Sequence, residues 1–223
     1  MKKDLKIALI PGDGIGKEVI PEGIRVIEKA AKKYGINIKW TEFDWSCERY
    51  LKTGYMMPED GIEQLRNYDA IYLGAVGFPN VLDHVSLWGL LIPIRRQFDQ
   101  YVNLRPVRLF EGIPCPLANK KPGDIDFFVV RENVEGEYSA IGGIQYEGTE
   151  NEIVSQQSIF TRRGTDRIIK YAFELAQSRE AKHLSSATKS NGIIHSMPYW
   201  DKRLNEIAKS FPKIKVDQYH IDI

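Results

Sequence analysis

The 223-residue chain contains 43% hydrophobic and 27% charged residues and has a formal net charge of +1. Its length suits two domains, and its composition is typical of a globular protein with a sizeable core. The balanced charge argues against nucleic acid or a membrane surface as the main partner. No apolar run approaches the ~20 residues that a membrane helix needs. Cys47 and Cys115 fit no metal or redox spacing, so we expect reduced thiols and a cytoplasmic location.

Strand and helix patterns alternate along the first hundred residues, which predicts a parallel, doubly wound sheet. The predicted strands are 5–10, 37–43 and 70–77, the predicted helices are 17–34 and 59–67, and a loop is expected over 80–92. After this loop, a helix from residue 94 is expected to run into an extended Arg-Pro segment.

The second half of the chain restarts the alternation after a stretch rich in Pro and Gly. This stretch, residues 111–123, is expected to cross between domains. The elements predicted beyond it are a strand at 124–130, a hairpin over 138–161, a helix at 163–178, a strand at 183–188, a helix at 196–210 and a strand at 214–222. The pattern predicts two α/β domains, residues 1–100 and 101–223.

The stretch "LIPGDGIGKEVI" at residues 9–20 places three glycines between a strand and a helix, where nucleotide-binding loops usually lie. A Walker A loop ending at Gly16-Lys17 would need glycine at Pro11 and a hydroxyl at Glu18. A Rossmann fingerprint starting at Gly12 would need its last glycine at Lys17. Both motifs fail, so the glycines need another explanation.

Three arginines are candidates for binding carboxylates, because guanidinium groups grip carboxylates at two points. Arg95 is on a predicted helix, and Arg105 and Arg131 end predicted extended segments. Arginines at strand ends point into the crevice where α/β sheets bind ligands. Surface ion pairs are the alternative for each one alone. Together the three suggest a substrate with more than one carboxylate.

Three further residues carry groups suited to chemistry near these arginines. Tyr138 can act as an acid and Lys189 as a base, because nearby positive charge favours the deprotonated form of each. Asp222, at a strand end, could hold a divalent cation, although one carboxylate does not make a metal site. Loop packing or a solvated surface position is the alternative reading for each residue.

Six segments, taken together and in order, resemble the isocitrate/isopropylmalate dehydrogenase family: PGDGIGKE, LGAVG, RRQFDQYVNLRP, VVRENVEGEY, SATKSNG and HID. The sequence between residues 83 and 109 is most similar to that of the tartrate and D-malate dehydrogenase (decarboxylating) branch. The resemblance implies a two-domain fold with mostly parallel sheets that is not a Rossmann fold. In that fold the GDGIG segment is a tight turn beside the nicotinamide.

The resemblance also implies a catalytic or substrate-binding role for each matching residue. Arg95, Arg105 and Arg131 would bind the carboxylates of a small dicarboxylate substrate. Lys189 would take the proton of the 2-hydroxyl group through a water molecule. Tyr138 would protonate the enol carbon after carbon dioxide leaves.

Cofactor and partner assignments follow from the same resemblance. NAD and Mg²⁺ or Mn²⁺ are implied, with Asn191, Gly74 and Ala75 at the cofactor and Asp222 at the metal. A homodimer joined by the second-domain hairpin is also implied. Lys189 and Asp222 would serve the partner subunit's site in it.

The implied activity is NAD-dependent oxidative decarboxylation of a small 2-hydroxy diacid such as D-malate or tartrate. Isopropylmalate oxidation and a non-catalytic fragment remain open alternatives. Isocitrate fits less well, because segment 83–91, with Trp88, has no obvious polar partner for a third carboxylate.

The chain stops inside an apolar strand, whereas family members continue past the position of Ile223. We therefore expect a C-terminally truncated member that binds metal and NAD poorly and shows no turnover alone. Its first domain is expected to expose apolar surface, and its second domain to be closer to complete.

Overall fold

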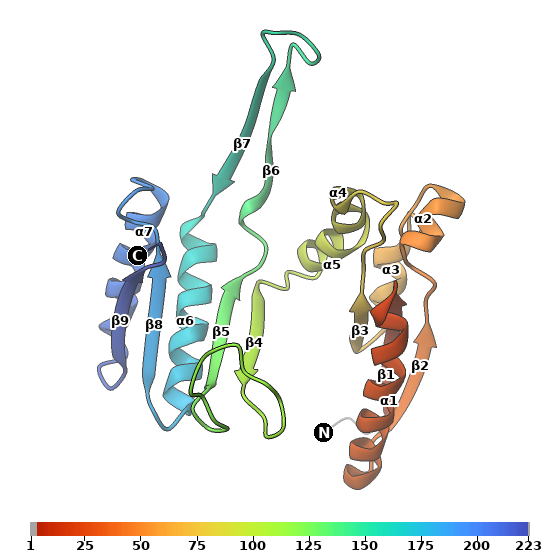
Figure 1. Cartoon of the computed structure of the whole chain (residues 1–223), viewed down its shortest axis with the longest axis horizontal. Coiled ribbons are helices and arrows are strands. Elements are labelled where there is room, and N and C mark those ends of the chain that lie inside the picture. The colour runs from red at the N-terminus through yellow and green to blue at the C-terminus, as the bar shows by residue number, and fades with distance from the viewer. Residues whose placement is uncertain (1–3, 223) are drawn as a thin grey trace. The chain divides into compact units, whose positions relative to one another are not determined.

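A computed structural model describes residues 4–222 of the chain. Contacts divide the chain into two compact units, Met1–Phe98 and Asp99–Ile223. Each unit combines strands with helices around a hydrophobic core of its own (Figure 1). Within the described range, no helix has both the length and the apolar character needed to cross a membrane.

A three-stranded parallel sheet forms the centre of the first unit, as the alternating pattern predicts. β1 (Asp4–Gly12) lies between β2 (Asn37–Glu42) and β3 (Ala70–Ala75), and both neighbours run parallel to it. Residues 8–10 of β1 are buried. Because alternate residues of a strand face opposite sides, β1 contributes to packing on both faces of the sheet.

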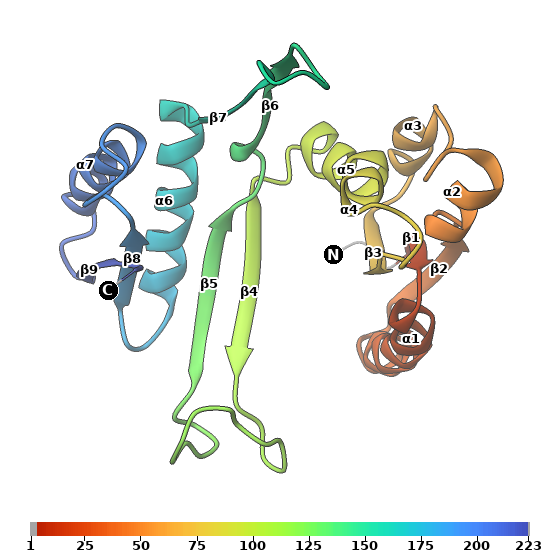
Figure 2. The same ribbon diagram turned by 45° about the horizontal axis from the view of Figure 1, so that its top comes forward.

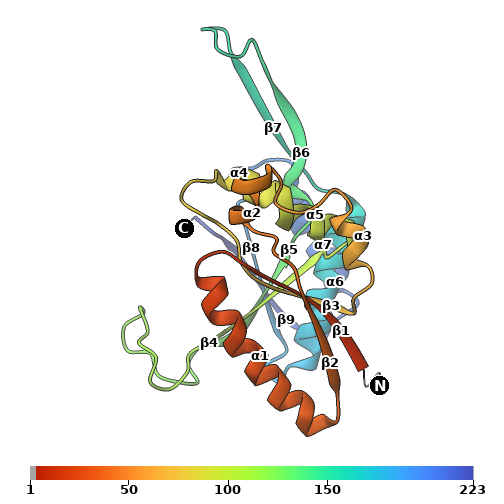
Figure 3. The same cartoon turned by 90° about the vertical axis from the view of Figure 1, so that its right-hand side faces the viewer.

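One face of this sheet is covered by α1 (Ile15–Tyr34), which contacts all three strands (Figure 3). Ile20 and Ala31 are the buried apolar residues of α1. They are eleven positions apart, which places them on one side of a helix. The helix predicted for residues 17–34 is confirmed, with its start two residues earlier.

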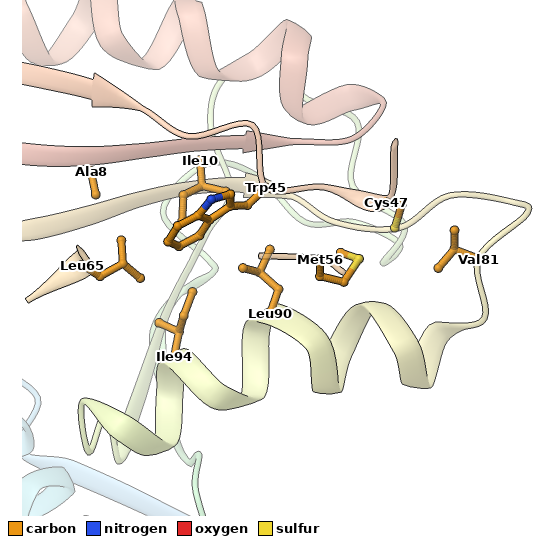
Figure 4. Packing of buried hydrophobic residues seen from close by; sticks show 9 residues of the cluster. All are labelled: Ala8, Ile10, Trp45, Cys47, Met56, Leu65, Val81, Leu90 and Ile94. Carbon is orange, nitrogen blue, oxygen red and sulfur yellow. The ribbon is translucent and has the colours of Figure 1, made fainter. Parts of the chain in front are cut away.

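The opposite face of the sheet carries the main core of the first unit. Figure 4 shows Leu90 and Ile94 pointing from their helix toward the indole of Trp45. Trp45 is only 2% exposed although it lies in a connection between elements. The fully buried members of this core are Ala8, Ile10, Trp45, Cys47, Met56, Leu65, Val81, Leu90 and Ile94.

The loop predicted for residues 80–92 is wrong. Three helical segments follow one another there without a break: α4 (Asp83–Ser86), the π-helical turn η1 (Leu87–Leu91) and α5 (Ile92–Gln97). Of the apolar residues that suggested the centre of a loop, Leu90 is buried on a helix face, whereas Trp88 is 39% exposed. Leu90 and Ile94 are four positions apart, so they lie on the same face and pack together into the core.

Two short helices complete the first unit. α2 (Cys47–Thr53) lies outside every helix predicted from the sequence, and α3 (Gly61–Leu65) is a shorter form of the helix predicted over 59–67. The Ser46 side chain caps α2 by accepting the N–H of Arg49 at 3.1 Å. A serine that leads into a short helix is a weak signal, because the same residue type also favours turns.

In the described part of the second unit, up to residue 222, the strands form three separate pairs. β4 (Val102–Arg108) and β5 (Asp126–Glu132) are antiparallel, as are β6 (Gly136–Gln145) and β7 (Ile153–Ile159). β8 (His183–Thr188) and β9 (Lys215–His220) are parallel.

Two helices pack against the β4–β5 and β8–β9 pairs. α6 (Arg162–Ser178) lies between the β4–β5 pair and the β8–β9 pair and also contacts α7 (Ser196–Ala208) (Figure 2). The core around them consists of Ile168, Ile169, Phe173, Ala176, Leu204 and Ile214.

The Pro- and Gly-rich segment 111–123 does not cross between domains as predicted. It joins β4 to β5, which are neighbouring antiparallel strands of one unit. The division between units falls earlier, between Phe98 and Asp99. Pro and Gly mark a change of chain direction, and they do so equally in a hairpin connection and in a linker.

That the second domain is closer to complete than the first stays a prediction. Large apolar side chains are exposed in both units, but more of them lie in the second unit. Many belong to the β6–β7 hairpin, which extends away from the rest of its unit (Figure 1). They include Ile141, Ile144, Tyr146, Ile153 and Val154.

Candidate active-site residues

Close backbone packing explains Gly12 and Gly16 of the GDGIG turn, whereas Gly14 has a φ of 45°, in the left-handed region that favours glycine. A Cβ atom on Gly16 would lie 2.2 Å from the carbonyl oxygen of Pro11 and 2.6 Å from the backbone nitrogen of Ala75. A Cβ atom on Gly74 would also lie 2.2 Å from the Pro11 oxygen. The turn after β1 therefore packs directly on the end of β3, which answers the question raised by the two failed phosphate motifs.

Gly74 and Ala75, predicted as cofactor residues, are the last two residues of β3. The Ala75 carbonyl accepts the N–H of Asp13 at 2.7 Å. A shallow groove of about 450 Å³ begins two residues later and is lined by residues from Gly77 to Asp83. Such a groove, at the carboxyl end of a parallel strand, fits the usual place of ligands in α/β sheets.

Asp13 is a buried residue that sequence reasoning did not single out. Its side chain is 1% exposed, and its carboxylate accepts the N–H groups of Cys47, Glu48 and Gly77 at 3.0, 3.3 and 3.2 Å. Burial, followed by the hydrogen bond to Asp13, raises the pKa of the Cys47 thiol to about 12. An acidic residue between two glycines of a tight turn is the signal that could have drawn attention to it.

Arg105 and Arg131 lie on the same face of the β4–β5 pair. Arg131 is directly opposite Asn103 in the antiparallel register, and Asn103 and Arg105 are two positions apart on β4. Residues opposite each other, or two apart on one strand, share a face. The Nε of Arg105 donates to Oδ1 of Asn103 at 3.2 Å. Two of the three arginines that are predicted to bind substrate carboxylates are thus brought together.

Asn133, another residue not singled out by its sequence context, supports this face. It is 5% exposed, and its amide donates to the carbonyl oxygen of Gln100 at 3.0 Å. Its Oδ1 accepts from the amide of Asn103 at 3.3 Å. Asn133 therefore links the end of β5 to the start of β4. A single asparagine in the sequence gives no indication of such a link.

Tyr138 contacts Arg131 directly. Nη2 of Arg131 donates to the phenol oxygen at 3.1 Å, and the guanidinium carbon lies 5.6 Å from the centre of the ring. This distance is within the range of a cation–π contact. A carboxylate held by Arg131 would therefore lie next to a phenol able to deliver a proton.

Lys189, Asn191 and Asp222 form a second group. Lys189 follows β8 and Asp222 follows β9, and the carboxyl ends of these parallel strands lie at the same edge. The Lys189 ammonium donates to Oδ2 of Asp222, and the Asn191 side chain hydrogen-bonds the same carboxylate. These contacts, led by the one from Lys189, hold the pKa of Asp222 below its ordinary value.

A divalent cation does not fit the described residues alone. Among residues 4–222, no cluster of three or more His, Cys, Asp or Glu side chains could hold a metal ion. Asp222 contributes one carboxylate, and Lys189 already occupies it. Mg²⁺ and Mn²⁺ prefer several oxygen ligands, so Asp222 would need further ligands from elsewhere.

Arg95 is the third predicted carboxylate ligand, and it lies in the last turn of α5 in the first unit. Arg105, Arg131 and Tyr138 all belong to the second unit. Convergence of the three arginines on one crevice therefore stays a prediction.

Residues 6–223 match the model of the isocitrate/isopropylmalate dehydrogenase family, and the chain belongs to this family. The resemblance drawn from six short segments is thereby confirmed. The isocitrate dehydrogenase from Methylococcus capsulatus superposes with a TM-score of 0.82 at 28% sequence identity, covering 98% of this chain and 61% of that chain. The fold class is confirmed as well.

Two curated relatives carry the names of the branch suggested by the sequence. D-malate dehydrogenase (decarboxylating) of Escherichia coli (strain K12) is 63% identical over 225 residues, which is 100% of this chain and 62% of the relative. Tartrate dehydrogenase/decarboxylase of Pseudomonas putida is 64% identical over 220 residues, 98% of this chain and 60% of the relative. The chain thus spans about three fifths of the length of these relatives.

Proposed function

We propose that this chain is part of an oxidoreductase that oxidises and decarboxylates a small 2-hydroxy diacid of the D-malate or tartrate type, with NAD and Mg²⁺ or Mn²⁺. The observation that carries the proposal is the contact of Lys189 and Asn191 with Asp222 at one edge of the β8–β9 pair. It joins a candidate base, a polar amide and a candidate metal ligand. The names of relatives above 60% identity support the substrate class.

The proposed chemistry divides among the chain's own residues. Arg131 and Arg105 hold a substrate carboxylate on their shared sheet face. When bound, NAD would supply the acceptor for the hydride that leaves C2 of the substrate. Lys189 receives the proton of the 2-hydroxyl group. After the carbon–carbon bond to the β-carboxylate breaks and carbon dioxide leaves, Tyr138 donates a proton to the enol carbon.

The state of Lys189 places a condition on this scheme. An ammonium that donates to Asp222 is already protonated and cannot accept another proton. The proposal therefore requires Lys189 to pass a proton to another group and to release Asp222 before it takes the hydroxyl proton. The metal requirement also needs oxygen ligands additional to Asp222.

A homodimer with shared sites is part of the proposal. The β6–β7 hairpin exposes Ile144 and Val154, which lie directly opposite each other, together with further apolar side chains along both strands. An isolated two-stranded hairpin is only marginally stable in water. Pairing with the hairpin of a second copy would bury these side chains.

The buried Cys47 and partly buried Cys115 are both free thiols, which supports the cytoplasmic location we propose.

The activity test uses a completed protein, in which this chain is joined to the part of the Pseudomonas putida relative that it does not match. NADH formation is followed with D-malate, tartrate or isopropylmalate in the presence of Mn²⁺. The unaltered relative serves as the positive control, and circular dichroism and light scattering verify folding. Turnover with D-malate or tartrate is expected. Turnover only with isopropylmalate, or none in a folded protein, would contradict the proposal.

The shared site has its own test. Lys189→Ala and Arg131→Ala forms of the completed protein, each inactive, are mixed and allowed to exchange subunits. Hybrid dimers should recover part of the activity, because one of their two sites combines intact residues from both subunits. Absence of recovery after verified exchange would exclude sharing.

A further inference from the structure

The Asp13 carboxylate joins three segments of the first unit that are far apart in the sequence. Asp13 itself is in the turn after β1, Cys47 and Glu48 begin α2, and Gly77 follows β3. The carboxylate accepts an N–H from each of these three residues. The Asp13 N–H in turn donates to the Ala75 carbonyl oxygen. Asp13 is therefore bonded to the end of β3 through both its backbone and its side chain.

Burial makes these bonds stronger than their number suggests. Asp13 and Cys47 are 1% and 0% exposed. A buried carboxylate is stable only when its oxygens are well hydrogen-bonded, and bonds to an ionised acceptor are about twice as strong as neutral ones. The backbone at Gly16 also packs against the Ala75 nitrogen, so closely that a Cβ atom would not fit. The segment from Ala75 to Gly77 is thus fixed from two sides.

The fixed segment opens directly into the groove lined by Gly77, Phe78, Pro79, Val81, Leu82 and Asp83. We propose that Asp13 is a positioning residue for the cofactor side of the site, which holds this groove in its binding shape before any ligand enters. The link to the cofactor rests on the proposed function. The pre-formed geometry of the groove does not rest on the proposed function. An experiment can therefore contradict the groove geometry and the proposed function separately.

Hydrogen exchange of the unaltered 223-residue chain tests the geometry without any activity. The Cys47, Glu48 and Gly77 amides should exchange slowly in the absence of NAD, comparably to the Phe43 amide, which donates to the Leu9 carbonyl oxygen. In Asp13→Asn, the Gly77 amide should exchange about tenfold faster or more, because a charged acceptor is lost. Rapid exchange of the Gly77 amide in the unaltered chain would overturn the proposal.

Kinetics of the completed protein test the positioning role. Asp13→Asn should raise the KM for NAD about tenfold and leave the KM for the diacid within about twofold, since the loss is confined to the groove. Ser46→Ala is the matched control, because it removes the cap of α2 and leaves the Asp13–Gly77 bond in place. It should lower Tm with no change in the KM for NAD. Equal changes of both KM values in Asp13→Asn, or the same NAD effect in Ser46→Ala, would reduce Asp13 to a structural residue.

Discussion

Lys189 donates a hydrogen bond to the carboxylate of Asp222, a residue thirty-three positions further along the chain. Lys189 directly follows β8, and Asp222 lies two residues after the end of β9. The two strands are parallel neighbours. The contact links a candidate base to a candidate metal ligand.

Replacing Lys189 by methionine tests its role as the base. In the completed protein, Lys189→Met should lower kcat by about 10²–10⁴-fold, the usual contribution of general base catalysis. The KM for NAD should change little. Lys209→Met is the control, because Lys209 pairs only with the exposed Glu206 on the helix surface. Retention of more than about a tenth of the activity would remove Lys189 from the mechanism.

Replacing Arg131 by lysine keeps the charge and removes the planar fork. Arg131→Lys should lower kcat/KM for the diacid by about 10²-fold, because two-point binding of a carboxylate and the contact with the Tyr138 phenol are both lost. Steady-state kinetics measure the change. Arg108→Lys, on the same strand pair and bonded to Asp126, should have almost no effect. Equal effects of the two variants would make Arg131 a structural residue.

The two cysteines should differ in reactivity. Cys47 is buried, and its thiol pKa of about 12 keeps it protonated at neutral and mildly alkaline pH. Because the thiolate is the reactive form, iodoacetamide should label Cys115 and leave Cys47 unmodified until the chain unfolds. Mass spectrometry of tryptic peptides measures the ratio. Labelling of Cys47 in the folded chain would show that its burial is incomplete.

The raised pKa of the Cys47 thiol also predicts that the fold loses stability at alkaline pH. A thiol whose folded pKa lies above its unfolded value of about 8.5 stabilises the fold fully below that value. The contribution is lost as pH rises toward 12. The decrease in Tm between neutral and strongly alkaline pH should therefore be smaller in Cys47→Ala than in the unaltered chain. Equal decreases would mean that other groups dominate.

Phe173 should be a key residue for the stability of the second unit. It is fully buried and stacks on Phe211 with ring centres 5.0 Å apart. Phe173→Ala should lower the free energy of unfolding by about 3–5 kcal/mol, through lost burial and the cavity left behind. Phe110→Ala, at a position 62% exposed, is the control and should change it by less than about 0.5 kcal/mol. Urea denaturation compares the two.

Much of the fold could be predicted from local pattern. β1 and α1 have clear strand and helix periodicity, and their positions agree with the structure. Lys189 and Asp222 were each predicted at the end of a strand, whereas their contact with each other was not predicted. Arg105 and Arg131 were grouped because both were predicted to end extended segments; in the structure Arg105 lies in the middle of β4 and Arg131 near the end of β5.

Other features depended on partners distant in the sequence. The apolar segment read as a loop becomes a helix because Leu90 and Ile94 pack on Trp45, about fifty residues earlier. Gly12 and Gly16 of the first turn are required by the Ala75 backbone, and Asp13 accepts hydrogen bonds from the amides of Cys47 and Gly77. Periodicity reports which side of an element is buried, so the sequence by itself determined the strands and the long helices and their order, but not α2 or the helical segments over 83–91. Only the tertiary structure decided what each buried group touches, because those contacts join residues whose separation along the chain leaves no local trace.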